Sequence, residues 1–286
     1  MANTINNLYL HKAIKKHNMN KKVCIITGAS SGIGKALAYE YASIGHNIVI
    51  AARRIDLLSE IAKKIESKYS TKIITVAADV SNQKDCENII NKALDSFGQI
   101  DILINNAGVS QRALFENLDL DSFRKVIDIN YWGTVYCTKY ALPHLLKSKG
   151  SVVAVSSISG FSPLPARTAY CSSKYAIHGF LESLRIENMK KGLHVMIAAP
   201  EYTATEIREH AIVAGGEQQG ESPRDEQKML TTEFVAERIA RGVQKRRRTL
   251  VIGKMGTFTV IFTRLFPKIS DKLIYNYIKK EANSPF

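Results

Sequence analysis

The feature that most constrains the fold is an alternation of short apolar segments with longer amphipathic segments, which begins at residue 22. The apolar segments are rich in β-branched residues and have the length of strands, and the segments between them have helical periodicity. Strands that are apolar on both faces and are separated by helices are typical of a parallel sheet covered on both sides. We therefore predict one α/β domain with a doubly wound, mostly parallel sheet and helices on both faces. The predicted strands are 23–27, 47–51, 72–77, 101–104, 151–156 and 194–198, and the predicted helices are 33–44, 55–68, 82–97, 122–147 and 172–190.

The alternation stops at about residue 200, where a polar and glycine-containing stretch extends to about residue 230. A long insertion of this kind in a compact domain is usually a functional lid or a mobile loop. Helical periodicity returns at 232–245, a short strand follows at 249–252, and 256–280 is amphipathic, with Pro267 expected to divide it into two helices. We predict three parts, namely a basic N-terminal extension (1–21), a main domain with its lid (22–252) and a basic amphipathic tail (253–286).

The formal net charge of +14 comes from the two ends of the chain. Residues 1–22 contain five lysines and no acid, and residues 245–280 contain ten basic residues and one acid, whereas the part between them is almost neutral. Basic ends fit nucleic-acid binding, contact with an anionic membrane, or a solvated surface. We expect no nucleic-acid partner, and we regard peripheral membrane contact through the tail as an open alternative.

The cysteines and the hydropathy pattern indicate where the protein resides. The four cysteines are scattered, without a CxxC pair or a Cys/His cluster, so we predict neither a disulfide framework nor a metal site. No apolar run has the length of a bilayer span, and no secretory leader is apparent. We expect a cytoplasmic protein.

A glycine-rich turn, TGASSGIG, follows the first predicted strand at residues 27–34 and leads directly into a helix. Gly28 allows a sharp turn, and Gly32 and Gly34 allow backbone N–H groups to approach a phosphate. The N-terminus of the helix adds partial positive charge. This strand–turn–helix context predicts a dinucleotide site, and the alternative is a purely structural turn.

The spacing TGxxxGxG resembles that of the classical short-chain dehydrogenase/reductase family, which has a Rossmann-type fold. The rest of the chain agrees with this resemblance over roughly residues 22–252, because NNAG occurs at 105–108 and Asp79-Val80 closes the third strand. The resemblance implies a catalytic tetrad of Asn130, Ser157, Tyr170 and Lys174. It implies that Asp79 contacts adenine, that Lys174 holds the nicotinamide ribose and that Asn130 anchors a water in a proton relay. If the resemblance to the family is set aside, the alternative for Ser157 is a hydroxyl that forms hydrogen bonds with the backbone at the end of a strand. The alternative for Asn130 is an amide in the interior of a helix.

Two Tyr-x-x-x-Lys pairs occur in the sequence, Tyr170/Lys174 and Tyr275/Lys279, so the spacing alone is weak evidence. Only the first has a serine thirteen residues upstream, Ser157, whereas Phe262 occupies the equivalent position for the second. A phenol with a pKa near 10 needs a neighbouring cation to work as an acid–base group, which Lys174 can provide. Ser157 can donate a hydrogen bond to a carbonyl oxygen. We interpret Tyr170/Lys174 as the active pair and Tyr275/Lys279 as a surface pair.

The cofactor preference is predicted from the end of the second strand. Ala52 stands where NAD-dependent members of the family carry an acid, and Arg53 and Arg54 follow it. An arginine accommodates the 2′-phosphate of NADP(H), so we predict NADP(H) rather than NAD(H), with Arg53 as the main contact and Arg54 as a further one. The alternative is two solvated arginines at the start of a helix. The predicted cofactor-binding residues are Gly28, Ser30, Ser31, Gly32, Ile33, Gly34, Arg53, Arg54, Asp79, Val80, Asn106, Ala107, Gly108, Tyr170, Lys174, Pro200, Thr203 and Thr205.

One departure from the family pattern follows the sixth strand, where Glu201 replaces the glycine of a Pro-Gly pair. Thr205 occupies the place of the threonine that reaches the nicotinamide carboxamide in the family. The Glu201 carboxylate either lies near the nicotinamide or points into solvent, and the sequence does not decide between these.

The resemblance and the motifs together predict an NADP(H)-dependent oxidoreductase that interconverts a carbonyl and an alcohol. We expect a hydrophobic small-molecule substrate and a homodimer or homotetramer. Substrate specificity is expected to depend on segments 159–168 and 200–230 and on the tail, which we expect to cover the substrate cleft or a neighbouring subunit. The alternatives are a non-catalytic NADP(H)-binding regulator and a basic membrane- or nucleic-acid-binding module on a reductase scaffold.

Overall fold

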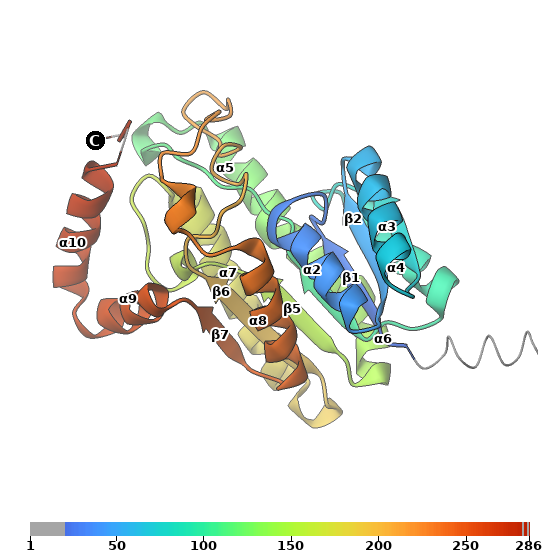
Figure 1. The fold of residues 1–286 in the computed structure, drawn as a ribbon. Helices are drawn as coiled ribbons and strands as arrows, with labels where there is room; N and C mark the ends of the chain where they lie inside the picture. The colour runs from blue at the N-terminus through green and yellow to red at the C-terminus, as the bar shows by residue number, and fades with distance from the viewer. Residues whose placement is uncertain (1–20, 282, 285) are drawn as a thin grey trace, which may run out of the picture.

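The computed structural model describes residues 21–281, 283–284 and 286, so the predicted N-terminal extension lies outside the described residues except for Lys21. Within the described part, seven strands form one parallel sheet in the order β3-β2-β1-β4-β5-β6-β7 (Figure 1). The predicted doubly wound sheet is confirmed, and its pairs are all parallel. The strands are β1 (Val23–Thr27), β2 (Asn47–Ala52), β3 (Ile73–Ala77), β4 (Ile102–Asn105), β5 (Ser151–Val155), β6 (His194–Pro200) and β7 (Thr249–Ile252).

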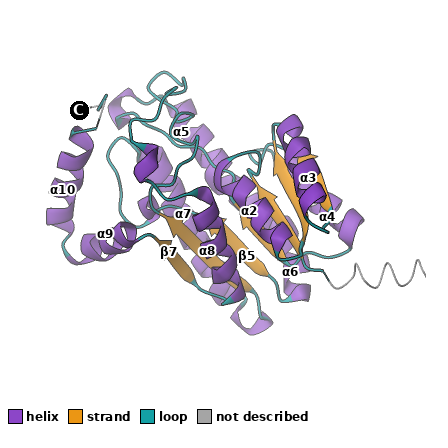
Figure 2. Cartoon of the chain, viewed as in Figure 1, coloured by secondary structure: helices purple, strands orange, loops and turns teal. Residues whose placement is uncertain are grey.

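Helices cover both faces of this sheet (Figure 2). Helices α2, α3 and α8 contribute to the buried cluster on one face, and α4, α6 and α7 contribute to the cluster on the other face. The helices are α2 (Gly32–Ser43), α3 (Ile55–Lys68), α4 (Gln83–Phe97), α5 (Leu120–Ile127), α6 (Gly133–Ser148), α7 (Thr168–Glu187), α8 (Thr232–Gln244), α9 (Lys254–Leu265) and α10 (Pro267–Lys279).

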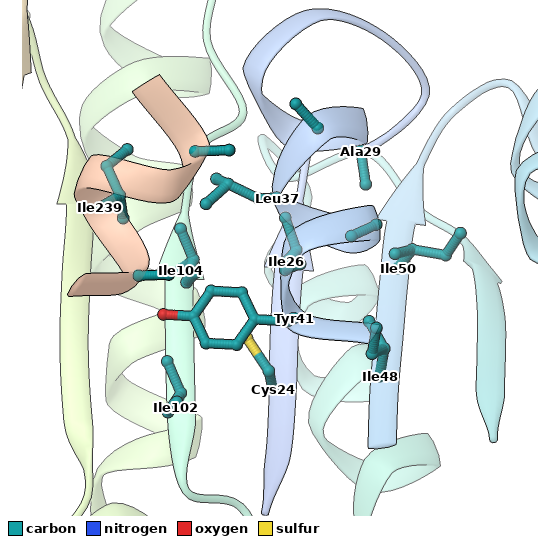
Figure 3. Packing of buried hydrophobic residues seen from close by; sticks show 14 of the residues in the cluster. Cys24, Ile26, Ala29, Leu37, Tyr41, Ile48, Ile50, Ile102, Ile104 and Ile239 are labelled. Carbon is teal, nitrogen blue, oxygen red and sulfur yellow. The ribbon is translucent and has the colours of Figure 1, made fainter. Parts of the chain in front are cut away.

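The two core clusters follow from the alternation of side chains along each strand. In β1, Cys24 and Ile26 belong to the cluster beneath α2 and α8, whereas Ile25 belongs to the cluster on the other face. Figure 3 shows the ring of Tyr41 from α2 lying among Cys24 and the isoleucines of neighbouring strands. Full burial of each such side chain contributes about 1.5–3 kcal/mol, so a register shift of one residue would be strongly disfavoured.

The structure corrects one predicted helix. The segment expected to be a single helix at 122–147 is divided by a π turn, Asp128–Trp132, which separates α5 from α6. The side chain of Asn130 lies in this turn and forms two hydrogen bonds with the backbone of Val109. The 3.6-residue periodicity of the sequence gives no sign of a π turn. Such turns occur frequently at functional sites.

The order of the strands determines where a ligand can bind. After β1 the chain continues to β2 and β3 on one side, whereas β4 to β7 extend on the other side. In open α/β sheets, ligands bind at the carboxyl ends of the strands where this direction reverses. The glycine-rich turn after β1 and the segment Asn106–Gly108 after β4 lie at this point.

The tail forms the two predicted helices, α9 and α10, with Pro267 at the start of the second. Figure 1 shows them beside β7, away from the centre of the sheet. Many of their apolar residues are exposed in the single chain, so much of their apolar surface is not buried against the domain. None of the described helices combines the length and the apolar character needed to cross a bilayer. The exposed apolar side chains are those of Met255, Phe258, Ile261, Leu265, Phe266, Ile269, Leu273, Tyr275 and Tyr277.

Candidate active site

The glycine-rich turn is packed directly against the segment that follows β4. Gly28 and Gly32 have positive φ angles of 64° and 54°. A Cβ atom on Gly28 would lie 2.6 Å from the Cα of Ala107, and one on Gly34 would lie 2.3 Å from the carbonyl oxygen of Gly28. Side chains at these two positions would therefore displace the backbone, so the turn requires glycine.

Hydrogen bonds hold this turn in place. The Asn106 amide donates to the carbonyl oxygens of Thr27 and Gly28, at 3.0 and 3.1 Å. The Thr27 hydroxyl accepts from the backbone N–H groups of Asn106 and Ala107, at 3.0 and 3.1 Å. The predicted residues after β1 and β4 are thus brought together in one rigid corner.

The start of α2 fits an anionic ligand. Its N-cap residue, Ser31, makes no side-chain capping bond, and its first turn contains no acidic residue. Backbone N–H groups and the positive end of the helix dipole are therefore left for a phosphate, as a nucleotide pyrophosphate requires. Thr205 lies across from this turn, because a Cβ atom on Gly32 would be 3.2 Å from its Cγ2. The residues present fit a dinucleotide.

The structure separates the two arginines after β2. The Arg54 guanidinium lies 3.2 Å from the hydroxyls of both Ser30 and Ser31, and 3.6 Å from the carboxylate of Glu206 in the lid. Arg53 instead lines a cavity of about 200 Å³ together with Asp79. Arg54 is therefore adjacent to the glycine-rich turn, and Arg53 is adjacent to the end of β3. The remaining residues that line this cavity are Ser81, Asp121, Arg124, Lys125, Asp128 and Ile129.

Asp79 and Val80 have distinct surroundings. The Asp79 carboxylate accepts from the backbone N–H and the hydroxyl of Ser81, at 2.9 and 2.7 Å. Val80 is buried, and it lies so close to α6 that a Cβ atom on Gly133 would be 2.8 Å from its Cγ2. These contacts fix the end of β3 beside the cavity that Arg53 lines.

Tyr170 and Lys174 lie one turn apart on α7. The Lys174 ammonium is buried, donates to the carbonyl oxygen of Val155 at 3.1 Å and lies 5.5 Å from the centre of the Tyr170 ring. Burial lowers the pKa of Lys174 to about 8. Burial also raises the pKa of Tyr170 to about 12, while a hydrogen bond with Ser157 and the positive charges of Arg167 and Arg208 oppose that rise.

Asn130 is fixed by three hydrogen bonds in the π turn. Its carbonyl oxygen accepts from the Val109 N–H at 2.8 Å, and its amide donates to the Val109 carbonyl at 3.0 Å and to the Ser173 hydroxyl at 2.9 Å. The Ser173 hydroxyl in turn donates to the carbonyl oxygen of Tyr170 at 2.7 Å. The structure thus links Asn130 to the turn of α7 that carries the tyrosine, with Gly108 between Asn130 and Lys174.

The predictions from sequence missed a buried partner behind Lys174. His178 lies one further turn along α7, and its Nε2 is 2.7 Å from the hydroxyl of Ser156, the residue before Ser157. Burial, assisted by the charge of Lys174, lowers the pKa of His178 to about 4, so the ring is neutral at pH 7. The spacing 170, 174, 178 on one helix face is the signal that could have found it.

The side chain of Glu201 is directed toward the tail and not into solvent. Its carboxylate accepts a hydrogen bond from the backbone N–H of Gly256 at 2.7 Å, in the first turn of α9. It also fills the space where a Cβ atom on Gly253 would lie. A carboxylate at a helix N-terminus is favourable, so Glu201 connects the end of β6 to the tail.

Local contacts fix the other predicted residues after β6. Pro200 ends β6 and is buried, and the Thr203 hydroxyl donates to the carbonyl oxygen of Glu201 at 2.9 Å. The Thr205 hydroxyl donates to the carbonyl oxygen of Thr203 at 3.4 Å. This local bonding holds Thr205 opposite Gly32.

Comparisons with known proteins agree with this geometry. Residues 22–213 match the model of the short chain dehydrogenase family. An Arabidopsis thaliana protein named 11-beta-hydroxysteroid dehydrogenase-like 3 is 43% identical over 201 residues, which are 70% of this chain and 65% of that protein. 11-beta-hydroxysteroid dehydrogenase A of Sesamum indicum is 38% identical over 224 residues, which are 78% of this chain and 64% of that protein. The match thus spans less than two thirds of the length of these relatives.

Solved structures show the same architecture. An alcohol dehydrogenase from the archaeon Thermococcus sibiricus, complexed with 5-hydroxy-NADP, is 25% identical with a TM-score of 0.71, over 82% of this chain and 96% of that chain. A short chain dehydrogenase/reductase from Burkholderia phymatum in complex with NAD is 22% identical with a TM-score of 0.77, over 88% of this chain and 96% of that chain. The family match, the relatives and the parallel sheet lead to one assignment. This protein belongs to the classical short-chain dehydrogenase/reductase family of oxidoreductases.

Proposed function

We propose that the protein is an NADP(H)-dependent oxidoreductase that transfers a hydride between nicotinamide and a carbonyl or alcohol substrate with a hydrophobic body. The observation that carries this proposal is the arrangement of the half-buried Tyr170 and Ser157 with the buried Lys174, beside the corner formed by the glycine-rich turn. A regulator that only binds the cofactor has no need of a buried proton donor with a cation beside it.

Each residue of the tetrad has a chemical task. Tyr170 delivers a proton to the carbonyl oxygen, and its raised pKa keeps it protonated at neutral pH. Ser157 donates a hydrogen bond to the same oxygen. Lys174, with a pKa of about 8, is mostly charged at pH 7 and stabilises the phenolate that remains. Asn130 holds the start of α7 through Ser173, and from the family resemblance it would anchor a water in the proton relay.

The residues of the corner would hold the cofactor, which supplies the hydride when it is bound. The N–H groups at the start of α2 would hold its pyrophosphate, Asp79 and Val80 its adenine, and Lys174 its nicotinamide ribose. Thr205, opposite Gly32, would reach the nicotinamide carboxamide. The other residues proposed to line this site are Gly28, Ile33, Gly34, Asn106, Ala107, Gly108, Tyr170, Pro200 and Thr203.

NADP(H) is proposed over NAD(H) because of the arginines after β2. Arg54 with the hydroxyls of Ser30 and Ser31 forms a basic and polar group suited to a 2′-phosphate, and Ala52 carries no charge that would repel it. The Thermococcus alcohol dehydrogenase was solved with an NADP derivative, which supports this choice. Arg53 is proposed to contribute to cofactor binding from the cavity that it lines together with Asp79.

Cofactor binding tests this choice. We expect Arg54→Ala to weaken NADPH binding by about ten- to a hundredfold, because a charge-assisted contact is lost, with little change for NADH. Arg53→Ala should act in the same direction and more weakly. Equal weakening of both cofactors by either variant would show that the arginine does not contact the 2′-phosphate.

We also propose a homodimer or homotetramer in the cytoplasm. Support for self-association comes from an aromatic cluster on α6, α7 and the π turn, in which Trp132 is 41% exposed and stacks on Tyr136.

The tail, with its exposed apolar side chains and lysines, is the segment available for peripheral membrane contact. Sedimentation with anionic liposomes at low and high salt tests that contact. Salt-sensitive co-sedimentation lost when residues after Ile252 are removed would establish it, provided that the shortened chain remains folded and monodisperse.

Turnover tests the proposed function. NADPH oxidation should be measured with ketones of graded size and polarity, alongside NADH. We expect turnover of apolar ketones with NADPH. Cofactor binding without turnover of any carbonyl would favour the regulator. Salt-dependent binding to DNA or vesicles without cofactor binding would favour the basic module.

A further inference from the structure

Three guanidinium groups lie around one carboxylate where the tail meets the domain, and two of them pair with it. We call Arg112, Arg167, Arg224 and Glu281 the arginine cluster. Glu281 follows α10, and its side chain is 8% exposed. It accepts hydrogen bonds from Arg112, at 3.5 Å, and from Arg224. The negative charge of Glu281 also acts on Arg167 and favours its charged form. The cluster therefore holds two more positive charges than negative ones.

Two of the three arginines are occupied by this contact. Arg112 and Arg224 have side chains that are 7% and 14% exposed, and both are paired with Glu281. The Arg224 guanidinium also lies over the rings of Tyr202 and Tyr277, at 4.0 and 4.9 Å from their centres. These contacts connect the lid segment to the end of α10.

Arg167 has no such partner. Among the residues that the structure describes, no carboxylate lies within ion-pair distance of it, and its hydrogen bond, at 3.3 Å, goes to the carbonyl oxygen of its neighbour Ala166. Burial lowers the pKa of Arg167 to about 10, which the carboxylate of Glu281 partly opposes. The side chain is thus partly buried and charged, and within the described part of the chain most of its N–H donors have no protein partner.

Arg167 is also close to the reacting centre. It is the N-cap residue of α7, three positions before Tyr170, and its charge acts on that tyrosine. Segment 159–168, in which it lies, and the segment after β6 that carries Tyr202 are among the parts from which we expect substrate contacts. The free charge therefore lies on the substrate side of the site.

This position is electrostatically unfavourable unless an anion is present. A cation at a helix N-terminus opposes the helix dipole, and a partly buried charge without a partner loses hydration. A neutral substrate would cover Arg167 without supplying a counter-charge. A carboxylate would supply one, and a guanidinium can bind it with two parallel hydrogen bonds.

From this arrangement we infer that the substrate carries a carboxylate, which Arg167 binds with the support of Arg112 while Tyr170 acts on a carbonyl elsewhere in the same molecule. The inference rests on the proposed carbonyl reductase function and adds a substrate class to it, namely oxo or hydroxy acids with a hydrophobic body. Glu281 is the internal counter-ion of the cluster, and it competes for the positive charge that the substrate acid needs.

Matched substrates test the inference. Phenyl keto acids of graded chain length should be compared with their primary amides, which keep the ketone and the skeleton and remove the charge. In the full-length protein we expect kcat/KM to favour the acid over the amide by about ten- to a hundredfold at the optimal chain length. Arg167→Gln should reduce this preference nearly to one, because the effect of its charge on Tyr170 is common to acid and amide turnover and cancels in their ratio. Arg167→Lys should retain part of the preference. Arg238→Gln, at an exposed arginine of α8, is the control and should leave the preference unchanged.

A variant of opposite expected effect sharpens the test. Glu281→Gln removes the internal counter-charge, so it should increase the preference for the acid. Equal turnover of acid and amide by the wild type at every chain length would overturn the inference, as would an unchanged preference in Arg167→Gln.

Binding separates this inference from the proposed function. If no carbonyl is reduced, calorimetry of the NADP⁺-loaded protein with 4-phenylbutyrate and 4-phenylbutanamide still measures the site. Binding of the acid that is lost in Arg167→Gln would support an acid site even though reductase activity failed. Equal binding of the two probes would overturn the acid site, whatever the turnover.

Discussion

Helices α7 and α10 both carry a tyrosine followed four residues later by a lysine, and their surroundings differ completely. On α7, Lys174 is 4% exposed and donates to the carbonyl oxygen of Val155. On α10, Tyr275 is 43% exposed, and the Lys279 ammonium lies 6.0 Å from its ring centre. The pairs have the same spacing and the same ring–ammonium proximity. Burial and the neighbouring hydroxyl of Ser157 are what distinguish them, so the reactivity depends on the fold around the pair.

The largest difference between the two helices is expected when each hydroxyl is removed. Tyr170→Phe should lower kcat for ketone reduction by about 100- to 10,000-fold, because it removes the proton donor. Tyr275→Phe should leave kcat within about twofold, because Tyr275 lies outside the site. Circular dichroism and NADPH fluorescence check that both variants fold and bind cofactor. Comparable losses in the two variants would break the distinction.

The lysines provide the second comparison. Lys174→Met should lower kcat/KM by about ten- to a hundredfold, since a change of one unit in the pKa of Tyr170 corresponds to a factor of ten. Lys279→Met should have no measurable effect on turnover. The pH–rate profile distinguishes a tuning role from a purely structural one. Lys174→Met should shift the profile, and a uniformly lower rate with an unshifted profile would show that the charge does not tune the tyrosine.

The third turn of α7 carries a group without a counterpart on α10, namely His178. Its pKa is about 4 in the folded state and near 6.5 in the unfolded state, so the unfolded chain binds the extra proton first as pH falls. Its contribution to the free energy of unfolding is therefore lost between pH 6.5 and 4 and is fully retained above pH 6.5.

Thermal unfolding across this pH range measures the effect. His178→Gln should remove up to about 3 kcal/mol of the acid-induced loss of stability. His46 and His194, whose pKa values burial also lowers, should account for part of what remains. His210→Gln, at an exposed histidine in the lid, is the control. An unchanged pH slope in His178→Gln would contradict the buried, neutral state of this ring.

The smallest effect concerns the contact that attaches the tail. Glu201→Gln keeps a hydrogen-bond acceptor for the Gly256 N–H and removes the charge at the start of α9. We expect a loss of about 0.3–1 kcal/mol, together with faster proteolysis of α9 and α10. Glu217→Gln, at an exposed lid position, should change neither. Unchanged stability and proteolysis in Glu201→Gln would show that this contact does not hold the tail.

Much of the domain could be predicted from the sequence because its signals are local. The strands, the glycine-rich turn and the Tyr170/Lys174 pair are each encoded within a few residues. The spacing between Ser157 and Tyr170, which matches the family, distinguished the two Tyr-x-x-x-Lys pairs. The π turn was missed because Asn130 is held by Val109, which is 21 residues away in the chain. A local periodicity contains no information about such a partner.

The surroundings of the tail could not be predicted for the same reason. Glu201 bonds to a residue 55 positions further along the chain, and Arg112 is paired with a carboxylate 169 positions away. Several contacts between the tail and the domain are polar, such as the one between the hydroxyls of Ser162 and Thr263, which lie 2.9 Å apart. Charge pairing across such separations depends on the completed fold.

The central claim is that Tyr170, and not Tyr275, exchanges a proton in response to charge at the nicotinamide position. The near-ultraviolet absorbance of tyrosinate reports this directly when NADP⁺ is added at about pH 10, close to the pKa of an ordinary phenol. Because burial holds the pKa of Tyr170 at about 12 in the cofactor-free protein, the positive charge of NADP⁺ should release a proton from this residue. We predict an increase in tyrosinate absorbance in the wild type and in Tyr275→Phe, and none in Tyr170→Phe. An undiminished signal in Tyr170→Phe, or its loss in Tyr275→Phe, would contradict the account.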